Sequence, residues 1–336
     1  MGWPAEARAR DSYLPMNGES GTLQTSGVVE ILRPVPGPTK GGLKWRSVSG
    51  TGPLRNATCG GDPADAQLSA EMLHIQPHGT GRPLVVLPSF GLDHAAMGEI
   101  VEPVFDDVSV WRRLYIDLPG TGGSPSGDPR SDAVLDEVID TIQAELGDQR
   151  FAIAGWSYGG YIGAGVTRRL AQQVCGLMMV CTGFKIRPED RDLTGVLASI
   201  SEPGWLTQVP TDLHDHFAHA VGCQTIEIGK RIAAALGCNG PTDEEYLSSL
   251  RADGFALSDE AAPTYCTAPV CFLTGQRDRV IGFASLLGAL GSYDQGSLTA
   301  VSNAGHYLPL EQPSAFAAAT QFWLAECEAL LDADGA

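Results

Sequence analysis

The sequence is most informative at residues 151–160, which read Phe151-Ala-Ile-Ala-Gly155-Trp-Ser157-Tyr-Gly159-Gly160. The first four residues are apolar, as expected of a strand that is covered on both faces of a sheet. The next five fit the pattern Gly-x-Ser-x-Gly, and an apolar helical stretch follows. Such a serine sits on a sharp, strained turn, and the flanking glycines avoid collisions with the strand and the helix. This stretch predicts a nucleophilic serine at position 157.

A serine hydroxyl is a weak nucleophile until a base removes its proton, and the base works best when an acid orients it. Two short apolar runs offer these partners, because residues 270–274 are followed by Asp278 and residues 297–301 by His306. Both partners lie just past the carboxyl end of a predicted strand, where open α/β sheets place their ligand sites. We therefore expect Ser157, Asp278 and His306 to form a catalytic triad. The weaker alternatives are Asp259 or Glu260 as the acid and His74 or His78 as the base.

The order serine, aspartate, histidine resembles that of the α/β-hydrolase superfamily, in particular its serine esterases and lactonases with a cap. The resemblance runs from about Met72 to the C-terminus. Residues 117–124, Asp-Leu-Pro-Gly-Thr-Gly-Gly-Ser, resemble the family loop Asp-x-x-Gly-x-Gly-x-Ser, and residues 84–91 resemble the third strand and its oxyanion loop. The resemblance implies an α/β fold with a mostly parallel central sheet, helices on both faces and a helical cap insertion.

The oxyanion loop departs from the family pattern at one point. The family usually has His-Gly where this chain has Pro88-Ser89, so we expect Gly91 to make the turn instead. By the resemblance, the backbone N–H groups of Phe90 and Tyr158 form the oxyanion hole. The loss of one such donor typically lowers the rate by about 10²–10³-fold.

The chain divides into four segments by composition and pattern. Residues 1–66 are rich in Gly, Pro, Ser and Thr and are predicted to be a low-complexity, disordered segment; the alternative is translated upstream sequence, with a natural start at Met72. Residues 67–182 and 266–336 read as the two parts of the hydrolase core, and 183–265 as the helical cap. The predicted strands of the core are 72–76, 84–87, 114–117, 151–154, 174–181, 270–274 and 297–301, and its predicted helices are 132–146 and 313–331.

Composition narrows the range of partners. The 22 Lys and Arg residues against 40 Asp and Glu give a formal net charge of −18, which argues against nucleic acid and anionic membrane surfaces. The charge also weighs against an acidic acyl-carrier protein, unless a local patch such as Arg168-Arg169 attracts it.

No stretch is long and apolar enough for a membrane span, and no secretory signal is recognisable. Eight scattered cysteines read as thiols, with Cys223 and Cys238 as an alternative pair, so we expect a cytoplasmic protein.

Cofactor signals are weak. The sequence His214-Asp-His216-Phe-Ala-His219 invites a metal interpretation, but only His216 and His219 share a helix face, and no further ligands complete a tetrahedral site. No phosphate-binding loop and no dinucleotide fingerprint is present. We predict neither a metal nor another cofactor.

The sequence thus predicts a serine hydrolase that cleaves small to medium, apolar esters, lactones or thioesters through an acyl-enzyme. Aromatic and aliphatic residues of the cap segment are expected to line the acyl pocket or to form the cap's own core; they are Phe184, Trp205, Leu206, Phe217, Ile226 and Phe255. Two alternatives stay open. One is acyl transfer, peptide cleavage or cyclisation on the same triad, and the other is a ligand receptor without activity. The sequence predicts no oligomeric state.

Overall fold

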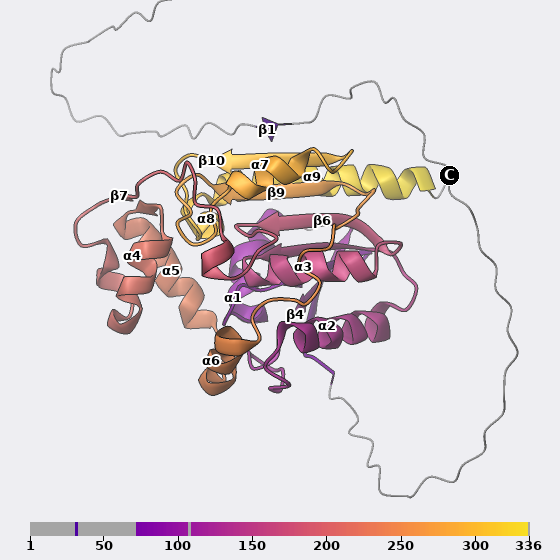
Figure 1. Cartoon of the computed structure of the whole chain (residues 1–336), viewed down its shortest axis with the longest axis horizontal. Helices are drawn as coiled ribbons and strands as arrows, with labels where there is room; N and C mark the ends of the chain where they lie inside the picture. Colours follow the sequence, from indigo (N-terminus) through magenta and orange to yellow (C-terminus); the bar gives the residue numbers. More distant parts are fainter. Residues whose placement is uncertain (1–30, 33–71, 107–108, 335–336) are drawn as a thin grey trace, which may run out of the picture.

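The structure is a computed structural model that describes residues 31–32, 72–106 and 109–334. The predicted disordered segment 1–66 lies outside the described residues, apart from the two residues Ile31–Leu32. The described part forms a sheet flanked by helices, with a helical insertion at one end of the sheet (Figure 1).

The sheet has eight strands in the order β1-β10-β9-β6-β5-β3-β4-β2. All neighbours from β10 to β4 are parallel, whereas β1 and β2 pair antiparallel at the two edges. The mostly parallel α/β sheet that the sequence predicted is therefore confirmed. The strands are β1 (Ile31–Leu32), β2 (Ile75–His78), β3 (Arg82–Leu87), β4 (Trp111–Ile116), β5 (Phe151–Trp156), β6 (Val174–Val180), β9 (Val270–Gly275) and β10 (Gly296–Val301).

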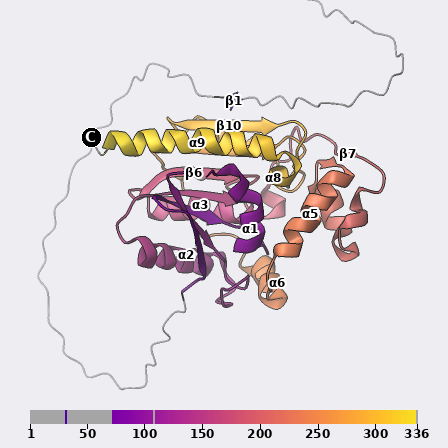
Figure 2. The ribbon, with the colours of Figure 1, turned by 180° about the vertical axis from the view of Figure 1, so that it is seen from behind.

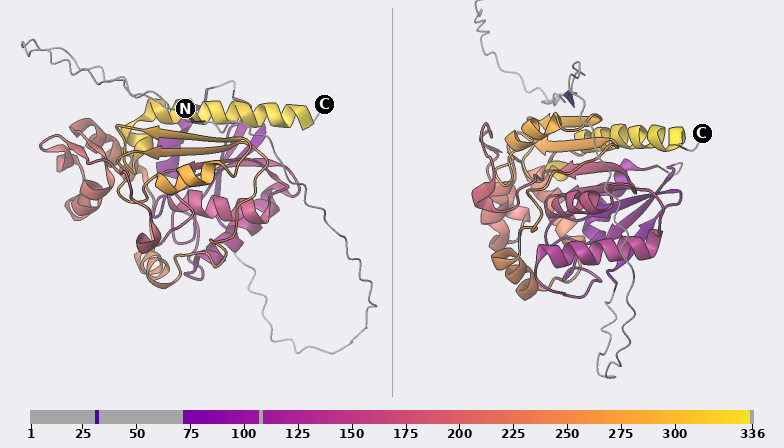
Figure 3. Two further views of the ribbon diagram at one scale, coloured as in Figure 1. Left: turned by 45° about the horizontal axis from the view of Figure 1, so that its top comes forward. Right: turned by 45° about the vertical axis from the view of Figure 1, so that its right-hand side comes forward.

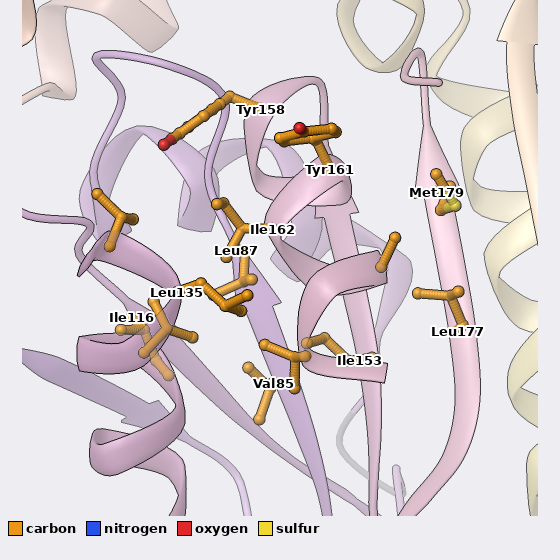
Figure 4. Packing of buried hydrophobic residues seen from close by; sticks show 14 of the residues in the cluster. Val85, Leu87, Ile116, Leu135, Ile153, Tyr158, Tyr161, Ile162, Leu177 and Met179 are labelled. Carbon is orange, nitrogen blue, oxygen red and sulfur yellow. The ribbon is translucent and has the colours of Figure 1, made fainter. Parts of the chain in front are cut away.

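Each strand sends alternate side chains to opposite faces, and both faces are covered by helices. Val85 and Leu87 of β3 belong to the core under α2, α3 and α7, part of which Figure 4 shows. Leu84 and Val86 belong to a second core under α1 and α9, the helices in front of the sheet when it is seen from behind (Figure 2). The helices around the sheet are α1 (His94–Val101), η1 (Glu102–Val104), α2 (Ser131–Leu146), α3 (Tyr158–Arg169), α7 (Ala284–Leu290), α8 (Leu308–Glu311) and α9 (Pro313–Asp334).

Strand β2 begins three residues after the predicted start at Met72, and helices α7 and α8 were not predicted. Two further elements also differ from the expectation. Strand β4 begins at Trp111, three residues before the predicted start, because Arg113 is buried in the strand by an ion pair with Glu102 (Nη2 to Oε2, 2.5 Å). Helix α1 was not predicted. It is started by Asp93, whose carboxylate accepts hydrogen bonds from the amides of Ala95 and Ala96 at 3.0 and 3.1 Å.

The chain between β6 and β9 forms the insertion, which lies at the end of the sheet toward which the carboxyl end of β10 points (Figures 1 and 3). It has a small core of its own, centred on Trp205, Phe217 and Ile232. Two of its strands pair only with each other, in parallel. Its elements are η2 (Pro188–Asp190), β7 (Ile200–Ser201), η3 (Trp205–Gln208), η4 (Thr211–Leu213), α4 (His214–Ala220), β8 (Cys223–Gln224), α5 (Ile226–Cys238) and α6 (Glu244–Asp253).

Residues 239–243, which we call the strap, fasten the insertion to the core. The amide of Gly122 donates to Pro241 O at 2.9 Å, and that of Asp243 donates to Gly120 O at 2.9 Å. The Gly240 amide also donates to the Asp93 carboxylate at 2.6 Å. These bonds fix the start of α6 against the loop that follows β4.

The seven cysteines that the structure describes are all free thiols, so the alternative pairing of Cys223 with Cys238 is wrong. Within the described ranges, no helix combines the length and apolar character needed to cross a bilayer.

Candidate active site

Ser157 occupies a sharp turn between β5 and α3. Its φ of 54° is unusual for a residue with a side chain and shows that the turn is strained. The turn is possible because its neighbours lack side chains. A Cβ on Gly155 would lie 2.4 Å from the Gly159 backbone, and one on Gly159 would lie 2.4 Å from the carbonyl oxygens of Leu87 and Pro88. The glycines therefore let the strand end, the helix start and the end of β3 meet around the serine.

Three residues from distant parts of the chain form one hydrogen-bonded relay. Ser157 Oγ lies 2.9 Å from His306 Nε2, and His306 Nδ1 lies 2.9 Å from Asp278 Oδ2. All three side chains are buried, with exposed fractions of 8% for Ser157, 4% for His306 and 0% for Asp278. Because a carboxylate can only accept, it assigns the proton to Nδ1 and leaves Nε2 free to accept from the serine hydroxyl.

Asp278 is held firmly at the end of β9. Its second oxygen, Oδ1, accepts the amides of Val280 and Ile281 at 2.9 and 3.0 Å, so both carboxylate oxygens are satisfied inside the protein. This arrangement orients the imidazole and compensates a buried negative charge. The alternative acids are engaged elsewhere, since Asp259 pairs with Arg168 and Glu260 with Lys185.

The loop after β3 runs through the predicted turn. Gly91 has a φ of 80°, and the Leu92 amide closes the turn on Ser89 O at 3.0 Å. Phe90 and Tyr158 line the same cavity as Ser157, and their rings meet edge to face at 5.5 Å. Tyr158 is the first residue of α3, where a helix attracts negative charge. That their amides act as oxyanion donors stays a prediction.

Sequence reasoning missed Asn239, a residue of the strap that holds the loop after β3. Its carboxamide accepts from the Asp93 amide at 2.9 Å and donates to Gly91 O at 3.0 Å. The side chain thus binds the loop on the C-terminal side of Phe90. In this chain the insertion itself supports the turn that replaces the family's usual His-Gly.

Glu311, also missed, organises the loop that carries His306. Its buried carboxylate accepts the amides of Gly305 (2.9 and 3.0 Å) and Tyr307 (3.2 Å), which flank the histidine. It also accepts the amides of Gly222 (3.0 Å) and Cys223 (2.7 Å) from the insertion. Burial outweighs these bonds and raises the pKa of Glu311 to about 7. One side chain therefore ties the histidine loop to the insertion.

Trp156, directly before the serine, is a third residue that supports the site by a hydrogen bond. Its indole N–H donates to His306 O at 3.0 Å, and both residues are buried. This contact joins the serine turn to the histidine loop. The signal available in the sequence was the tryptophan at the second position of Gly-x-Ser-x-Gly, whose indole N–H can donate a hydrogen bond.

The relay opens onto a cavity of about 620 Å³. Of the six insertion residues proposed for an acyl pocket, only Phe255 is among its lining residues; Trp205, Leu206 and Phe217 pack in the insertion's own core, and Phe184 packs against Phe272. The lining is more polar than the sequence suggested. It consists of Ser89, Phe90, Ser157, Tyr158, Ile186, Arg187, Pro188, Glu189, Arg191, His216, Arg251, Ala252, Phe255, Val280, Ile281, His306 and Tyr307.

The histidine cluster of α4 sends its three rings to separate partners. The Nε2 atoms of His214, His216 and His219 contact Val209 O, the Tyr307 hydroxyl and Arg279 O, respectively. Among the residues that the structure describes, one other group has metal-ligand types close together, namely His74, His94 and Asp117. Asp117 there already accepts from His94 Nδ1 and from the Gly123 amide, both at 2.9 Å, as a loop-stabilising carboxylate does.

The fold and the relay define an α/β hydrolase. A family model described as "Alpha/beta hydrolase family" matches residues 78–319, which is most of the chain, and the protein belongs to this family.

Two curated relatives with different names show similarity to this chain. The chain is 32% identical over 151 residues to the pimeloyl-[acyl-carrier protein] methyl ester esterase of Shewanella woodyi, a match that covers 44% of this chain and 53% of that protein. It is 26% identical over 252 residues to the 2-succinyl-6-hydroxy-2,4-cyclohexadiene-1-carboxylate synthase of Salmonella paratyphi A, covering 72% and 95%. The chain thus spans about half the length of the first of these relatives.

Solved structures agree on the fold. An α/β superfamily hydrolase from Oenococcus oeni PSU-1 superposes with a TM-score of 0.69 at 23% identity, covering 77% of this chain and 98% of that one. The enol-lactonase from Burkholderia xenovorans LB400 gives a TM-score of 0.58 at 20% identity, covering 75% and 96%. At these identities the likeness concerns the fold alone.

Proposed function

We propose that this protein is a serine hydrolase that cleaves carboxylic esters through an acyl-enzyme on Ser157. The observation that carries the proposal is the relay from Ser157 through His306 to Asp278, buried beside an open cavity. Relatives named as methyl ester esterases support the same chemistry.

The geometry supports the following sequence of steps. The hydroxyl of Ser157 attacks the ester carbonyl as His306 Nε2 takes its proton, and Asp278 stabilises the imidazolium that forms. The amides of Phe90 and Tyr158 stabilise the oxyanion of the tetrahedral intermediate. His306 then protonates the leaving alcohol, which departs and leaves the acyl group on Ser157. A water molecule, activated by the same histidine, releases the acid.

We further propose that residues 183–265 act as the cap over this site. Two features support this role. Insertion residues such as Arg187, His216 and Phe255 line the cavity, and the strap and Glu311 join the insertion to both catalytic loops. Cytoplasmic residence, and the absence of nucleic-acid and membrane partners, stay predictions from the sequence.

An acyl-carrier protein as the acyl donor is less well supported. The patch at Arg168 and Arg169 that would have attracted it is neutralised, because these residues pair with Asp259 and Asp136. We therefore expect a small-molecule ester as the substrate.

Turnover of p-nitrophenyl esters of graded acyl length tests the proposal. We expect a burst of nitrophenol equal to the enzyme concentration, followed by steady hydrolysis, and a loss of about 10⁴-fold or more in kcat for Ser157→Ala. Ser249→Ala, on the exposed face of α6, is the matched control and should keep full activity. Release of product only when an amine or alcohol is added would instead favour acyl transfer. Absence of turnover with every ester would favour a receptor.

A further inference from the structure

The cavity beside Ser157 reverses the charge of the rest of the protein. The chain as a whole carries 22 basic against 40 acidic residues. Among the residues that line the cavity there are three arginines, Arg187, Arg191 and Arg251, against one carboxylate, Glu189. A local excess of positive charge in a strongly acidic protein concentrates anions at that point.

Arg251 is presented to the cavity by stacking. Its guanidinium lies over the ring of Phe90 with Cζ 4.4 Å from the ring centre, and Phe90 also meets the rings of Tyr158 and Phe255 edge to face at 5.5 Å. A guanidinium held by its flat face keeps its N–H edge free to donate. Because Arg251, Phe90 and Ser157 line one cavity, a ligand there can meet both the guanidinium and the serine.

None of the three arginines of the cavity forms an ion pair with a carboxylate that the structure describes. By contrast, Arg113, Arg168 and Arg169 each pair with a carboxylate. Arg191 is fixed by neutral groups instead, since its guanidinium donates to the carbonyl oxygens of Ile186 and Val280. Arg191 also interacts electrostatically with Asp278 and Glu189, so it adds less positive charge to the cavity than Arg187 and Arg251 do.

The position of Arg251 is fixed through α6. This helix begins directly after the strap, whose bonds join it to the loop after β4. On its N-cap, Asp243 accepts the Tyr246 amide at 3.0 Å and the Ser126 hydroxyl at 2.7 Å. The arginine is thus carried by an anchored helix, as a binding residue requires.

We propose that this cavity binds an ester that also carries a carboxylate, with Arg251 as the main contact and Arg187 and Arg191 adding charge. The proposal rests on the proposed function and deepens it, because it replaces an apolar ester with a carboxylate-bearing one. A carboxylate matches the planar fork of a guanidinium by two parallel hydrogen bonds. Glu189, on the exposed η2, is the one carboxylate among the lining residues that opposes the arginines.

Binding to an inactive variant tests the inference without requiring turnover. Calorimetry on Ser157→Ala compares monomethyl esters of the straight dicarboxylic acids from succinate to suberate with methyl esters of fatty acids of equal length. We expect at least one half-ester to bind about tenfold or more tightly than its uncharged counterpart, the size of a charge-assisted contact. Adding Arg251→Gln should remove this preference, Arg251→Lys should restore part of it, and Arg231→Gln on α5, outside the cavity, should leave it intact.

Turnover by the unmutated protein then separates the two proposals. A preference for half-esters, or for acetoxy acids such as acetoxyacetate, supports the inference and shows whether the carboxylate belongs to the acyl or the alcohol side. If neutral esters are hydrolysed and each half-ester binds no more tightly than the fatty-acid methyl ester of equal length, the carboxylate site is overturned and the hydrolase proposal stands. Tight binding of half-esters that Arg251→Gln abolishes, with no ester cleaved, supports the carboxylate site and overturns the hydrolase.

Discussion

Replacing Glu311 by glutamine changes how the stability of this protein depends on pH. The carboxylate is 3% exposed and accepts four backbone amides that join the His306 loop to the insertion. Its burial raises its pKa from 4.5 to about 7 in the folded protein. A group whose pKa is raised by folding stabilises the folded state fully below its unfolded pKa, and this stabilisation is lost as the pH rises through the folded pKa.

The size of the effect follows from that shift. Between about pH 5 and about pH 8.5, Glu311 should lower the free energy of unfolding by about 2.5 kcal/mol. Glutamine has a similar shape but does not titrate, so Glu311→Gln lacks this slope. It also places an amide N–H₂ group against amide donors, at a cost of about 1–3 kcal/mol for each donor left without an acceptor.

Urea unfolding of both proteins at the two pH values measures the difference. We expect Glu311→Gln to be the less stable protein at about pH 5, and the gap between the two to shrink by about 2.5 kcal/mol at about pH 8.5. Glu99→Gln, at an exposed position of α1, is the control for general charge removal. Parallel pH dependence of the native protein and Glu311→Gln would show that the carboxylate does not titrate in this range and would refute the reasoning.

Three further substitutions test the site. Gly159→Ala places a Cβ 2.4 Å from two carbonyl oxygens at the end of β3, so kcat for p-nitrophenyl acetate should fall by about 10²-fold. Gly163→Ala is the control, because a Cβ there meets nothing nearer than 3.7 Å and should leave kcat unchanged. Equal rates for the two variants would contradict the account of the turn. Asp278→Asn should lower kcat by about 10⁴-fold with little loss of thermal stability, and a mild effect would remove Asp278 from the mechanism. Asn239→Ala removes two hydrogen bonds to the loop beside Phe90. It should lower kcat about tenfold while KM for a neutral ester stays within about twofold. An effect on KM alone would mean that Asn239 serves substrate binding only.

The core of the fold and the serine turn could be predicted because their signals are local. The strand β5 is apolar at nearly every position, and Gly155 and Gly159 occupy positions where any side chain would collide with backbone. Asp278 and His306 could be predicted as well, because they lie within a few residues of the ends of short buried strands. A parallel sheet brings the carboxyl ends of its strands together, so residues that follow them are neighbours in space whatever their separation along the chain.

The supporting residues could not be predicted because their partners are remote. Asn239 bonds to a loop nearly 150 positions earlier, and Glu311 bonds to amides at positions 222 and 223. No period or motif in either segment indicates these contacts, since they depend on how the insertion settles on the core. Arg251 was missed for the same reason, because only the folded chain shows that α6 carries it over Phe90.

The insertion also shows where composition misleads. Its aromatic and aliphatic residues could line a substrate pocket, although a small core of the insertion was the stronger expectation for any one of them, and residues such as Trp205 and Phe217 do pack in that core. An insertion that is joined to the sheet by a short strap must bury apolar side chains within itself to be ordered. Of the six residues predicted for the pocket or the core, only Phe255 lines the cavity, beside arginines and other apolar residues such as Ile186 and Ile281.

The central claim is that the buried relay makes Ser157 the nucleophile, and covalent trapping tests it most directly. The protein is treated with a fluorophosphonate, digested and mapped by mass spectrometry. The account predicts one adduct, on the peptide that contains Ser157, and its slow formation when His306 is replaced by alanine. An adduct on any other residue, or unchanged labelling of Ser157→Ala, would contradict it.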